Sequence, residues 1–152
     1  MTAQTIMTSQ PVVLKETDTV GTAVESILSH HLRHMPVVDH DGRYVGIFGI
    51  YSLLRLTLPK ALTLEQGLES VPFFQAGLEE LREHLHEQWN SSVVSCLRQD
   101  IPVLHPDTSL LDTVLTLLRA RIALPVVDKT TGRLEGMISS WSALEKIVGE
   151  KA

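Results

Sequence analysis

The chain contains a single cysteine, Cys96, so it cannot form an intramolecular disulfide. A lone cysteine fits a reducing compartment, and we interpret Cys96 as a small buried hydrophobe. The sequence also lacks an apolar segment long enough to cross a membrane, and its first residues do not pair basic side chains with an apolar run. We therefore expect a cytoplasmic protein without a membrane partner.

Positive charge is also scarce. Lysine and arginine total 13 against 18 acidic residues, for a formal net charge of −5. A nucleic-acid partner, which is bound by neutralising phosphates, is therefore not expected. The acid is concentrated in residues 60–90, which hold six carboxylates and two basic side chains.

Signatures of catalysis are missing as well. The sequence has no Gly-x-Ser-x-Gly elbow, no cysteine and histidine signature and no Walker-type phosphate loop. Asp39 and Asp128 resemble a carboxylate pair, but each ends a predicted strand before a turn, where aspartate suits the backbone. We predict no catalytic residue, no cofactor and no enzymatic activity.

The sequence does contain an internal repeat. Pro-Val-Val-Asp occurs at 36–39 and at 125–128, followed each time by a polar turn and a strand that ends in glycine and two apolar residues. The offset is 89 residues at the prolines and 90 at Gly42 and Gly132, so the second copy has one additional turn residue. A repeat of this kind indicates two copies of one structural unit.

Apolar periodicity predicts the same order of elements in each copy: strand, helix, strand, strand, helix. In the first copy, Thr17 or Asp18 is the expected N-cap of the first helix. Each copy has more apolar positions than it could cover alone, so we expect the two to pack face to face. The expected strands are 11–14, 36–39, 44–48, 101–104, 124–128 and 134–138, and the expected helices cover about 20–32, 51–58, 110–122 and 141–148.

These patterns divide the chain into a first copy at 1–59, an acidic helical connector at 60–90 and a second copy at 91–152. Pro72 splits the connector into possible helices at 61–70 and 75–89. The second of these is amphipathic, with leucines opposite glutamates, and we expect its apolar side to pack on the repeats rather than on a partner chain. Phe73, Phe74 and Trp89 are interpreted as filling the space between connector and repeats, the alternative being an exposed hook for another protein.

The repeated strands, turns and short helices resemble the CBS domain. The two copies together are similar to a tandem CBS pair, or Bateman module, which implies an α/β fold with two repeats related by a pseudo-twofold axis. The resemblance also implies a regulatory module without chemistry of its own. Such pairs often bind AMP, ADP, ATP or S-adenosylmethionine in clefts between the repeats, and commonly form homodimers.

The ligand motif of the family is Gly, two apolar residues, Ser or Thr, two further residues and Asp. In the first copy Gly46 begins this motif, Gly49 replaces the hydroxyl residue and Ser52 replaces the aspartate. In the second copy Gly136 and Ser139 match the motif, and Ser142 again replaces the aspartate. A serine hydroxyl accepts hydrogen bonds from ribose more weakly than a carboxylate, and losing about 1.5 to 3 kcal/mol would weaken binding about ten- to a hundredfold.

In some relatives, basic residues before the Pro-Val-Val-Asp strand face the phosphates of the ligand. Arg33 and His34 occupy these places in the first copy, and Arg121 is nearby in the second. Ser139 is expected to begin the last helix, where amide hydrogens can bind an anion. The resemblance therefore predicts the following ligand set: Gly136, Ser139, Ser142, Arg33, His34, Gly46 and Ser52. Trp141, between Ser140 and Ser142, could either stack on the base of a ligand or block the cleft.

Two alternatives remain open at this point. The first is a module that has lost its ligand and works by dimerisation or by binding another protein, an interpretation that the serines at 52 and 142 favour. The second is a metal or cofactor sensor that uses His30 and His34, although no complete metal motif is present and we predict no metal site. The main hypothesis is a homodimeric adenosine sensor that signals to an effector protein.

Overall fold

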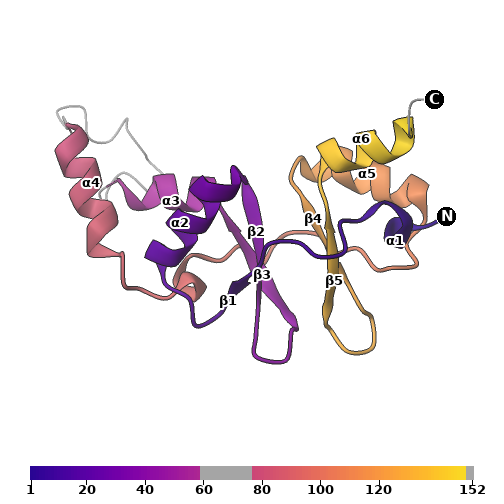
Figure 1. Ribbon diagram of the computed structural model, residues 1–152, viewed down its shortest axis with the longest axis horizontal. Helices are drawn as coiled ribbons and strands as arrows, with labels where there is room; N and C mark the ends of the chain where they lie inside the picture. Colours follow the sequence, from indigo (N-terminus) through magenta and orange to yellow (C-terminus); the bar gives the residue numbers. More distant parts are fainter. Residues whose placement is uncertain (59–76, 150–152) are drawn as a thin grey trace. The chain divides into compact units, whose positions relative to one another are not determined.

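The computed structural model describes residues 1–58 and 77–149 of the chain, so the predicted helix at 61–70 and the pair Phe73 and Phe74 lie outside the described residues. The chain forms two compact units, coloured along the sequence in Figure 1. The first unit combines residues 1–16, 34–47 and 98–152, and the second combines 17–33 and 48–97. No helix in the described part of the chain is long and apolar enough to span a membrane.

The first copy has the predicted order of elements. The N-cap of the first long helix is Thr19 rather than the expected Thr17 or Asp18, and its side chain accepts a hydrogen bond from the Thr22 amide. The helix ends at His31, which has a left-handed conformation. The strands form a sheet in the order β1-β2-β3, with Leu14 opposite Val37 in a parallel pair. Its elements are β1 Leu14–Lys15, α2 Val20–His30, β2 His34–Val38, β3 Tyr44–Gly49 and α3 Ile50–Leu56.

The second copy repeats this order with one correction. The expected strand at 101–104 is absent, because Pro102 has no amide hydrogen to donate and Leu104 alone bridges to Val126, in parallel. Ser109 caps the next helix as Thr19 does in the first copy, and β4 and β5 form an antiparallel hairpin. Its elements are α5 Leu110–Ala120, β4 Leu124–Val127, β5 Leu134–Ile138 and α6 Ser140–Val148.

The turns of the two hairpins bind each other within the first unit. The Tyr44 amide donates to the Gly132 carbonyl oxygen at 3.0 Å, and the Leu134 amide donates to the Gly42 carbonyl oxygen at 3.0 Å. Both glycines have positive φ, 80° and 76°, a conformation that other residues rarely adopt. These reciprocal bonds join equivalent positions of the two copies.

The segment that leads into each copy pairs with a strand of the other copy. Thr8 and Met137 exchange backbone hydrogen bonds of 2.8 and 3.1 Å, and Ile47 and Arg98 exchange two of 2.9 Å. Thr8 and Arg98 are 90 residues apart, as are Ile47 and Met137, so the two pairs of hydrogen bonds join equivalent positions of the two copies. The leading helix α1 Ala3–Ile6 contacts β5 and α6. The two copies are therefore interlocked within the first unit.

One apolar core fills the first unit. The first copy contributes Ile47 and the lead-in residues Ala3 and Ile6, and the rest come from the second copy, from its hairpin, its helices and the segment before α5. Burying side chains of this size contributes about 1.5 to 3 kcal/mol each. Its buried members are Ala3, Ile6, Ile47, Ile101, Leu104, Leu117, Leu124, Val126, Met137, Ile138 and Ala143.

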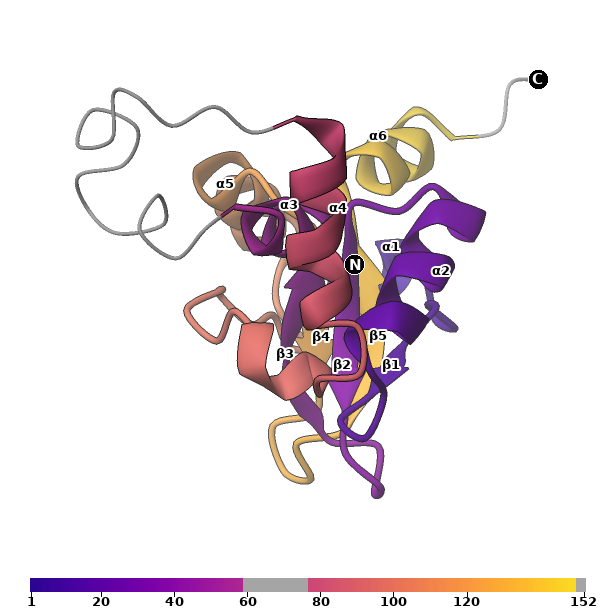
Figure 2. The same ribbon diagram turned by 90° about the vertical axis from the view of Figure 1, so that its left-hand side faces the viewer.

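The second unit holds the described end of the connector. Its helix α4 Leu78–Glu87 is shorter than the predicted 75–89 and lies against α3, as Figure 2 shows. Leu81 and Leu85 are half-buried and Leu78 is exposed, and the glutamates of this helix, at 79, 80, 83 and 87, are all exposed. His84 Nδ1 lies 3.0 Å from the Thr57 carbonyl oxygen. The helix therefore contacts α3 of its own chain, although none of its residues is buried.

Carbonyl groups after α4 then complete the start of α2. The amides of Val20 and Gly21 donate to the carbonyl oxygens of Ser91 and Trp89, each at 2.9 Å. These amides belong to the first helical turn and have no partner within α2. The chain then forms the 3₁₀ helix Val93–Cys96, whose Val93 is fully buried.

Candidate functional site

The ligand motif of the second copy begins at Gly136, which is buried on β5. A β carbon at this position would lie 2.6 Å from the Thr8 carbonyl oxygen and 2.8 Å from Met7 Sδ. Real β carbons do not approach other atoms so closely, so only glycine admits the leading segment here. Packing alone therefore requires the glycine that the sequence motif assigned to a ligand.

The two serines of this motif form a capping box at the start of α6. Ser139 Oγ accepts from the Ser142 amide at 3.0 Å, and Ser142 Oγ accepts from the Ser139 amide at 3.1 Å. The Ser139 hydroxyl also donates to Ser142 Oγ at 3.0 Å, and Ser142 Oγ donates to the Ser139 carbonyl oxygen at 3.1 Å. The structure thus brings together two of the predicted ligand residues and gives their hydroxyls a structural role.

The capping box uses the amide of Ser142 and leaves the amides of the two residues before it outside the box. Ser140 and Trp141 occupy the first two positions of α6, where amide hydrogens have no acceptor within the helix. Such amides attract an anion, and the helix dipole adds to the attraction. Trp141 itself is 76% exposed, so its indole is not part of the core.

The first copy presents the same motif without a capping hydroxyl. Gly46 and Gly49 are buried on β3, and Gly49 is the N-cap of α3 without a side-chain hydrogen bond. Ser52 is half-buried on the first turn of α3. Arg33 is exposed, and its carbonyl oxygen accepts from the Ile50 amide at 2.9 Å. Within the second unit, the chain at Arg33 therefore lies beside the beginning of α3.

The remaining predicted ligand residue, His34, is half-buried at the start of β2. Arg121 ends α5 in a left-handed conformation and is exposed. His31 occupies the equivalent position 90 residues earlier, at the end of α2. The residue of the first copy that corresponds to Arg121 is therefore His31.

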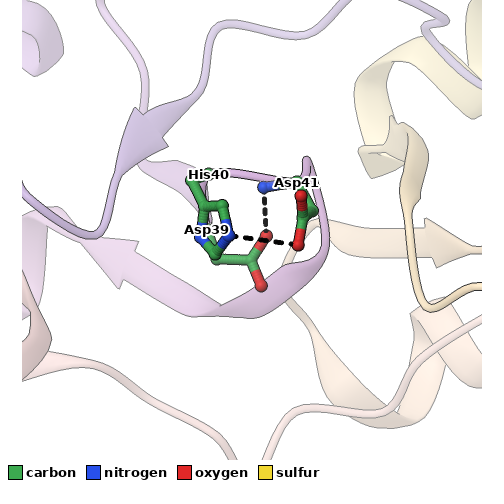
Figure 3. Close-up of side chains that lie close together, drawn as sticks. All are labelled: Asp39, His40 and Asp41. Atoms are coloured by element: carbon green, nitrogen blue, oxygen red, sulfur yellow. Dashed lines mark hydrogen bonds and ion pairs between the residues drawn. The ribbon is translucent and has the colours of Figure 1, made fainter.

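The aspartates that end β2 and β4 have the structural role that the sequence indicated. Asp39 Oδ1 accepts from the amides of Asp41 and Arg43, each at 2.9 Å, and Figure 3 shows the first of these bonds. These bonds, led by that from Arg43, hold the pKa of Asp39 below its ordinary value. Asp128 Oδ1 accepts from the Thr130 amide at 2.8 Å, which likewise lowers its pKa. Both carboxylates stabilise turns.

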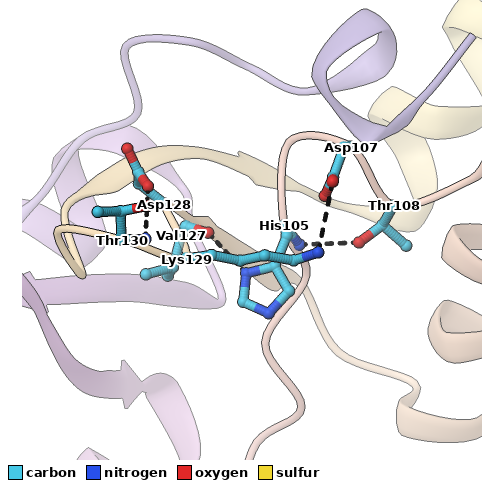
Figure 4. Close-up of polar contacts among 7 residues, drawn as sticks. All are labelled: His105, Asp107, Thr108, Val127, Asp128, Lys129 and Thr130. Carbon is cyan, nitrogen blue, oxygen red and sulfur yellow. Dashed lines mark hydrogen bonds and ion pairs between the residues drawn. The ribbon is translucent and has the colours of Figure 1, made fainter.

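A polar cluster that the sequence did not reveal fixes the end of β4. His105 Nδ1 lies 2.8 Å from the Val127 carbonyl oxygen, and the His105 amide donates to Thr108 Oγ1 at 2.9 Å. Lys129 forms an exposed ion pair with Asp107 at 3.3 Å (Figure 4). A histidine that binds a backbone carbonyl has no periodic signal, so only the folded chain identifies its partner.

The histidine hypothesis can also be compared with the structure. Within the described residues, the one group of side chains arranged for a shared metal ion is Asp39, His40 and Asp41. His30 and His34 are not part of it, and His30 Nδ1 lies 2.9 Å from the Ser26 carbonyl oxygen. His40 Nε2 lies 3.2 Å from Asp41 Oδ2, and both side chains are exposed. The alternative in which His30 and His34 share a metal ion thus gains no geometric support from the described residues.

One polar atom stands out in the first unit. The hydroxyl oxygen of Tyr44 is buried and has no hydrogen-bond partner among the described residues. Burial, with a smaller effect from the Asp100 carboxylate, raises the pKa of Tyr44 to about 12. The equivalent residue in the second copy is Leu134, so the hairpin contact does not need the hydroxyl.

Comparison with known proteins agrees with this geometry. The sequence model of the CBS domain matches residues 3–58 and 93–149, which together are more than half of the chain. The chain belongs to the CBS domain family. The two matches correspond to the two copies, and the fold is that of a tandem CBS pair. No curated protein matches the sequence.

Solved structures with the same CBS-pair fold include a plant protein and proteins with bound ligands. CBSX2, a CBS-pair protein from Arabidopsis thaliana, has a TM-score of 0.75 and 23% identity over 97% of this chain and 94% of that one. CBSX2 in complex with AMP has a TM-score of 0.72 and 23% identity over 97% and 96% of the two chains. The CBS domain pair of protein MJ0100, in complex with 5'-methylthioadenosine and S-adenosylmethionine, has a TM-score of 0.65 and 16% identity over 99% and 98%.

Proposed function

We propose that this chain is a non-catalytic regulatory module that binds an adenosine-type ligand and passes the bound state to an effector protein. The observation that supports the proposal is the start of α6, where β5, which contains Gly136 and ends at Ile138, leads through Ser139 into the first helical turn. Proteins with the same fold have been crystallised with AMP and with S-adenosylmethionine. The proposed ligand residues are those predicted from the sequence.

The contacts at α6 favour a particular way of binding. Because the hydroxyls of Ser139 and Ser142 already bind each other, the amides of Ser140 and Trp141 are the donors that remain for a phosphate oxygen. Arg33, as a cation, and His34, as a hydrogen-bonding side chain, remain proposed ligand residues on the strength of the sequence motif. No carboxylate at 52 or 142 can hold the ribose hydroxyls, so we propose that binding depends more on phosphate than on ribose.

Thermal unfolding with and without millimolar AMP, ADP, ATP or S-adenosylmethionine tests this function, because a ligand that binds only the folded state raises the melting temperature. The most informative variant is Ser139→Asp. Aspartate is a good N-cap and keeps the start of α6, but its charge repels a phosphate. Loss of the AMP response with retention of the S-adenosylmethionine response would locate the phosphate at this turn.

Ser109→Asp is the matched control. Ser109 caps α5 as Ser139 caps α6, and its Oγ accepts from the Asp112 amide at 3.1 Å. This variant should respond to AMP as the unmodified chain does. If no adenosine compound raises the melting temperature of the unmodified chain, ligand sensing is excluded at those concentrations.

The second candidate is a ligand-free module that works by dimerisation or by binding another protein. The capping box favours it, since the two hydroxyls that would face a ligand are engaged with each other. Isothermal titration with AMP separates the two functions, because this candidate predicts no heat of binding while the chain remains dimeric.

Three further features complete the proposal. The chain acts as a homodimer, has no catalytic residues and works in the cytoplasm, where a single unpaired cysteine such as Cys96 remains reduced. A ligand that prefers one packing of the two repeats shifts the population toward it by no more than its difference in affinity. The effector protein then recognises the favoured packing.

A further inference from the structure

Two arginines lie opposite each other where the hairpin turns of the two copies meet. Arg43 and Arg133 are equivalent residues, each directly after the glycine of its turn, and they form an antiparallel backbone bridge. The hydrogen bonds of this bridge join the residues that precede the arginines to those that follow them, so the arginines are the pair that is not hydrogen-bonded. In such a pair the α carbons are about 4.5 Å apart and the side chains leave on the same face. The fold therefore sets two cations side by side.

Each of these side chains lies across the turn of the other copy. A β carbon at Gly42 would be 3.4 Å from Nη2 and 3.8 Å from Cζ of Arg133, so the guanidinium of Arg133 lies over the first turn. A β carbon at Gly132 would be 4.0 Å from Cγ of Arg43, so the stem of Arg43 passes the second turn. The charged end of Arg133 is therefore held beside the backbone from which Arg43 extends.

No carboxylate neutralises this pair of cations. Arg43 and Arg133 are exposed, and neither forms an ion pair with another described residue. The carboxylates of Asp39 and Asp128 accept hydrogen bonds from backbone amides of their own turns. The pKa of Asp39 is lowered first by the amide of Arg43 and least by its side-chain charge, so this carboxylate is bound to the backbone. Glu135, the next acidic residue along β5, forms no ion pair with any described residue.

The arrangement favours an anion with two adjacent charged groups. Like charges directly opposite each other on a ladder destabilise it, and an anion that contacts both guanidiniums removes that repulsion. A guanidinium presents a planar fork of donors that matches the oxygen atoms of a phosphate group. A diphosphate has two such groups joined by one oxygen atom, so each group can accept from one arginine. Because both side chains are exposed, the site selects its ligand by charge.

We propose that Arg43 and Arg133 together bind the diphosphate group of inorganic pyrophosphate or of a nucleoside diphosphate, at the contact between the two hairpin turns. Each chain then binds one diphosphate, because the site takes one residue from each copy. A ligand held in this way stabilises the contact between the copies, since it interacts with both. The site uses no residue at the start of α6 and does not depend on the proposed binding of an adenosine compound there.

Isothermal titration of the full chain with inorganic pyrophosphate, at constant ionic strength, tests the site. Arg43→Gln and Arg133→Gln should each weaken binding about tenfold or more, because each removes one charge-assisted fork. Arg119→Gln is the matched control, since it removes the same charge from an exposed arginine on α5 that also lacks an ion pair among the described residues. Unchanged affinity in both turn variants, or no heat of binding at millimolar pyrophosphate, would overturn the proposal.

Thermal unfolding tests the repulsion between the two arginines. At low salt and without an anion, Arg133→Gln should raise the melting temperature by about 1 to 3 °C, because one member of the like-charge pair is gone. With saturating pyrophosphate the order should reverse, since the anion stabilises mainly the unmodified chain. A lower melting temperature for Arg133→Gln without an anion would show that the arginines do not repel each other and would overturn the argument for a ligand.

Further titrations separate this site from the start of α6 and identify the source of the diphosphate. Pyrophosphate binding that persists in Ser139→Asp and is lost in Arg43→Gln supports the site, whatever the response of the chain to AMP. The reverse result places the anion at the start of α6 and overturns the proposal. In the Ser139→Asp chain, ADP that displaces pyrophosphate identifies a nucleoside diphosphate as a ligand, whereas ADP that does not displace it identifies free pyrophosphate; both results retain the arginine site.

Discussion

Trp89 packs on Gly21 so closely that a β carbon at position 21 would meet the indole nitrogen. The Gly21 amide also donates to the Trp89 carbonyl oxygen at 2.9 Å. The connector is thereby attached to the start of α2 by both its backbone and its largest side chain. The described end of the connector, residues 77–90, is therefore part of the folded second unit.

This contact predicts that Gly21→Ala has opposite effects on stability in the presence and in the absence of the Trp89 side chain. Gly21→Ala should destabilise the chain by about 1 to 3 kcal/mol, because the new methyl group overlaps the indole. In a Trp89→Ala background the same change should stabilise it by about 0.5 to 1 kcal/mol, as alanine favours a helix over glycine. Urea unfolding of the four proteins measures both values, and destabilisation in both backgrounds would contradict the proposed overlap.

The two backbone hydrogen bonds between Thr8 and Met137 depend on Gly136 in a similar way. Gly136→Ala should lower the free energy of unfolding by about 1 to 3 kcal/mol, since the leading segment must move away from β5. Hydrogen exchange should then be faster at the amides of Thr8 and Met137, which form the exchanged bonds. Gly77→Ala is the control, because a β carbon there has no atom within 4 Å. An unchanged rate of amide hydrogen exchange at Thr8 in Gly136→Ala would contradict the prediction that the leading segment moves away from β5.

The buried hydroxyl of Tyr44 predicts stabilisation by its removal. Tyr44→Phe should raise the free energy of unfolding by about 0.5 to 2 kcal/mol, since it removes a buried oxygen without a hydrogen-bond partner and keeps the ring. Chemical unfolding at pH 7 measures the change. A loss of stability instead would indicate that the hydroxyl has a partner in solution.

The raised pKa of Tyr44 also predicts alkaline sensitivity. Between the ordinary value of 10.0 and the folded value of about 12, the unfolded chain loses this proton before the folded chain does. Ionisation of Tyr44 therefore does not affect the free energy of unfolding below pH 10. As the pH rises from 10 toward 12, it lowers the free energy of unfolding, because only the unfolded chain has lost the proton. Unfolding midpoints at pH 9 and pH 11 should show a smaller decrease for Tyr44→Phe than for the unmodified chain.

Asp39 predicts the opposite dependence on pH. Its pKa is below the ordinary value of 3.8, so the stability that it contributes is present above 3.8 and is lost as the pH falls through the folded pKa. Asp39→Asn keeps an acceptor for the Asp41 and Arg43 amides and should reduce the loss of stability in acid, whereas Asp39→Ala should lower the melting temperature at pH 7. Asp41→Asn is the control and should leave the melting temperature at pH 7 nearly unchanged.

Local patterns in the sequence were sufficient to predict most of the fold. The repeat of Pro-Val-Val-Asp located both hairpins, and apolar spacing located the helices α2 and α5. The short parallel pairs were predicted less well, because Leu14 and Leu104 pair with strands far along the chain and have few pattern residues of their own. The candidate site was predicted as a set of residues, and the capping box was missed because its second member is serine instead of the usual glutamate or glutamine.

The sequence by itself determined that there are two copies, because turn residues and apolar spacing recur at offsets of 89 and 90 residues, and these are local properties. Only the tertiary structure decided how the copies interlock, which carbonyl oxygens complete α2 and why Gly136 and Gly21 must be glycine. Those facts depend on atoms that are distant in sequence but in contact in space. A hydrogen bond between Thr8 and Met137, or the room for an indole at Gly21, is a property of two segments and is encoded in neither segment alone.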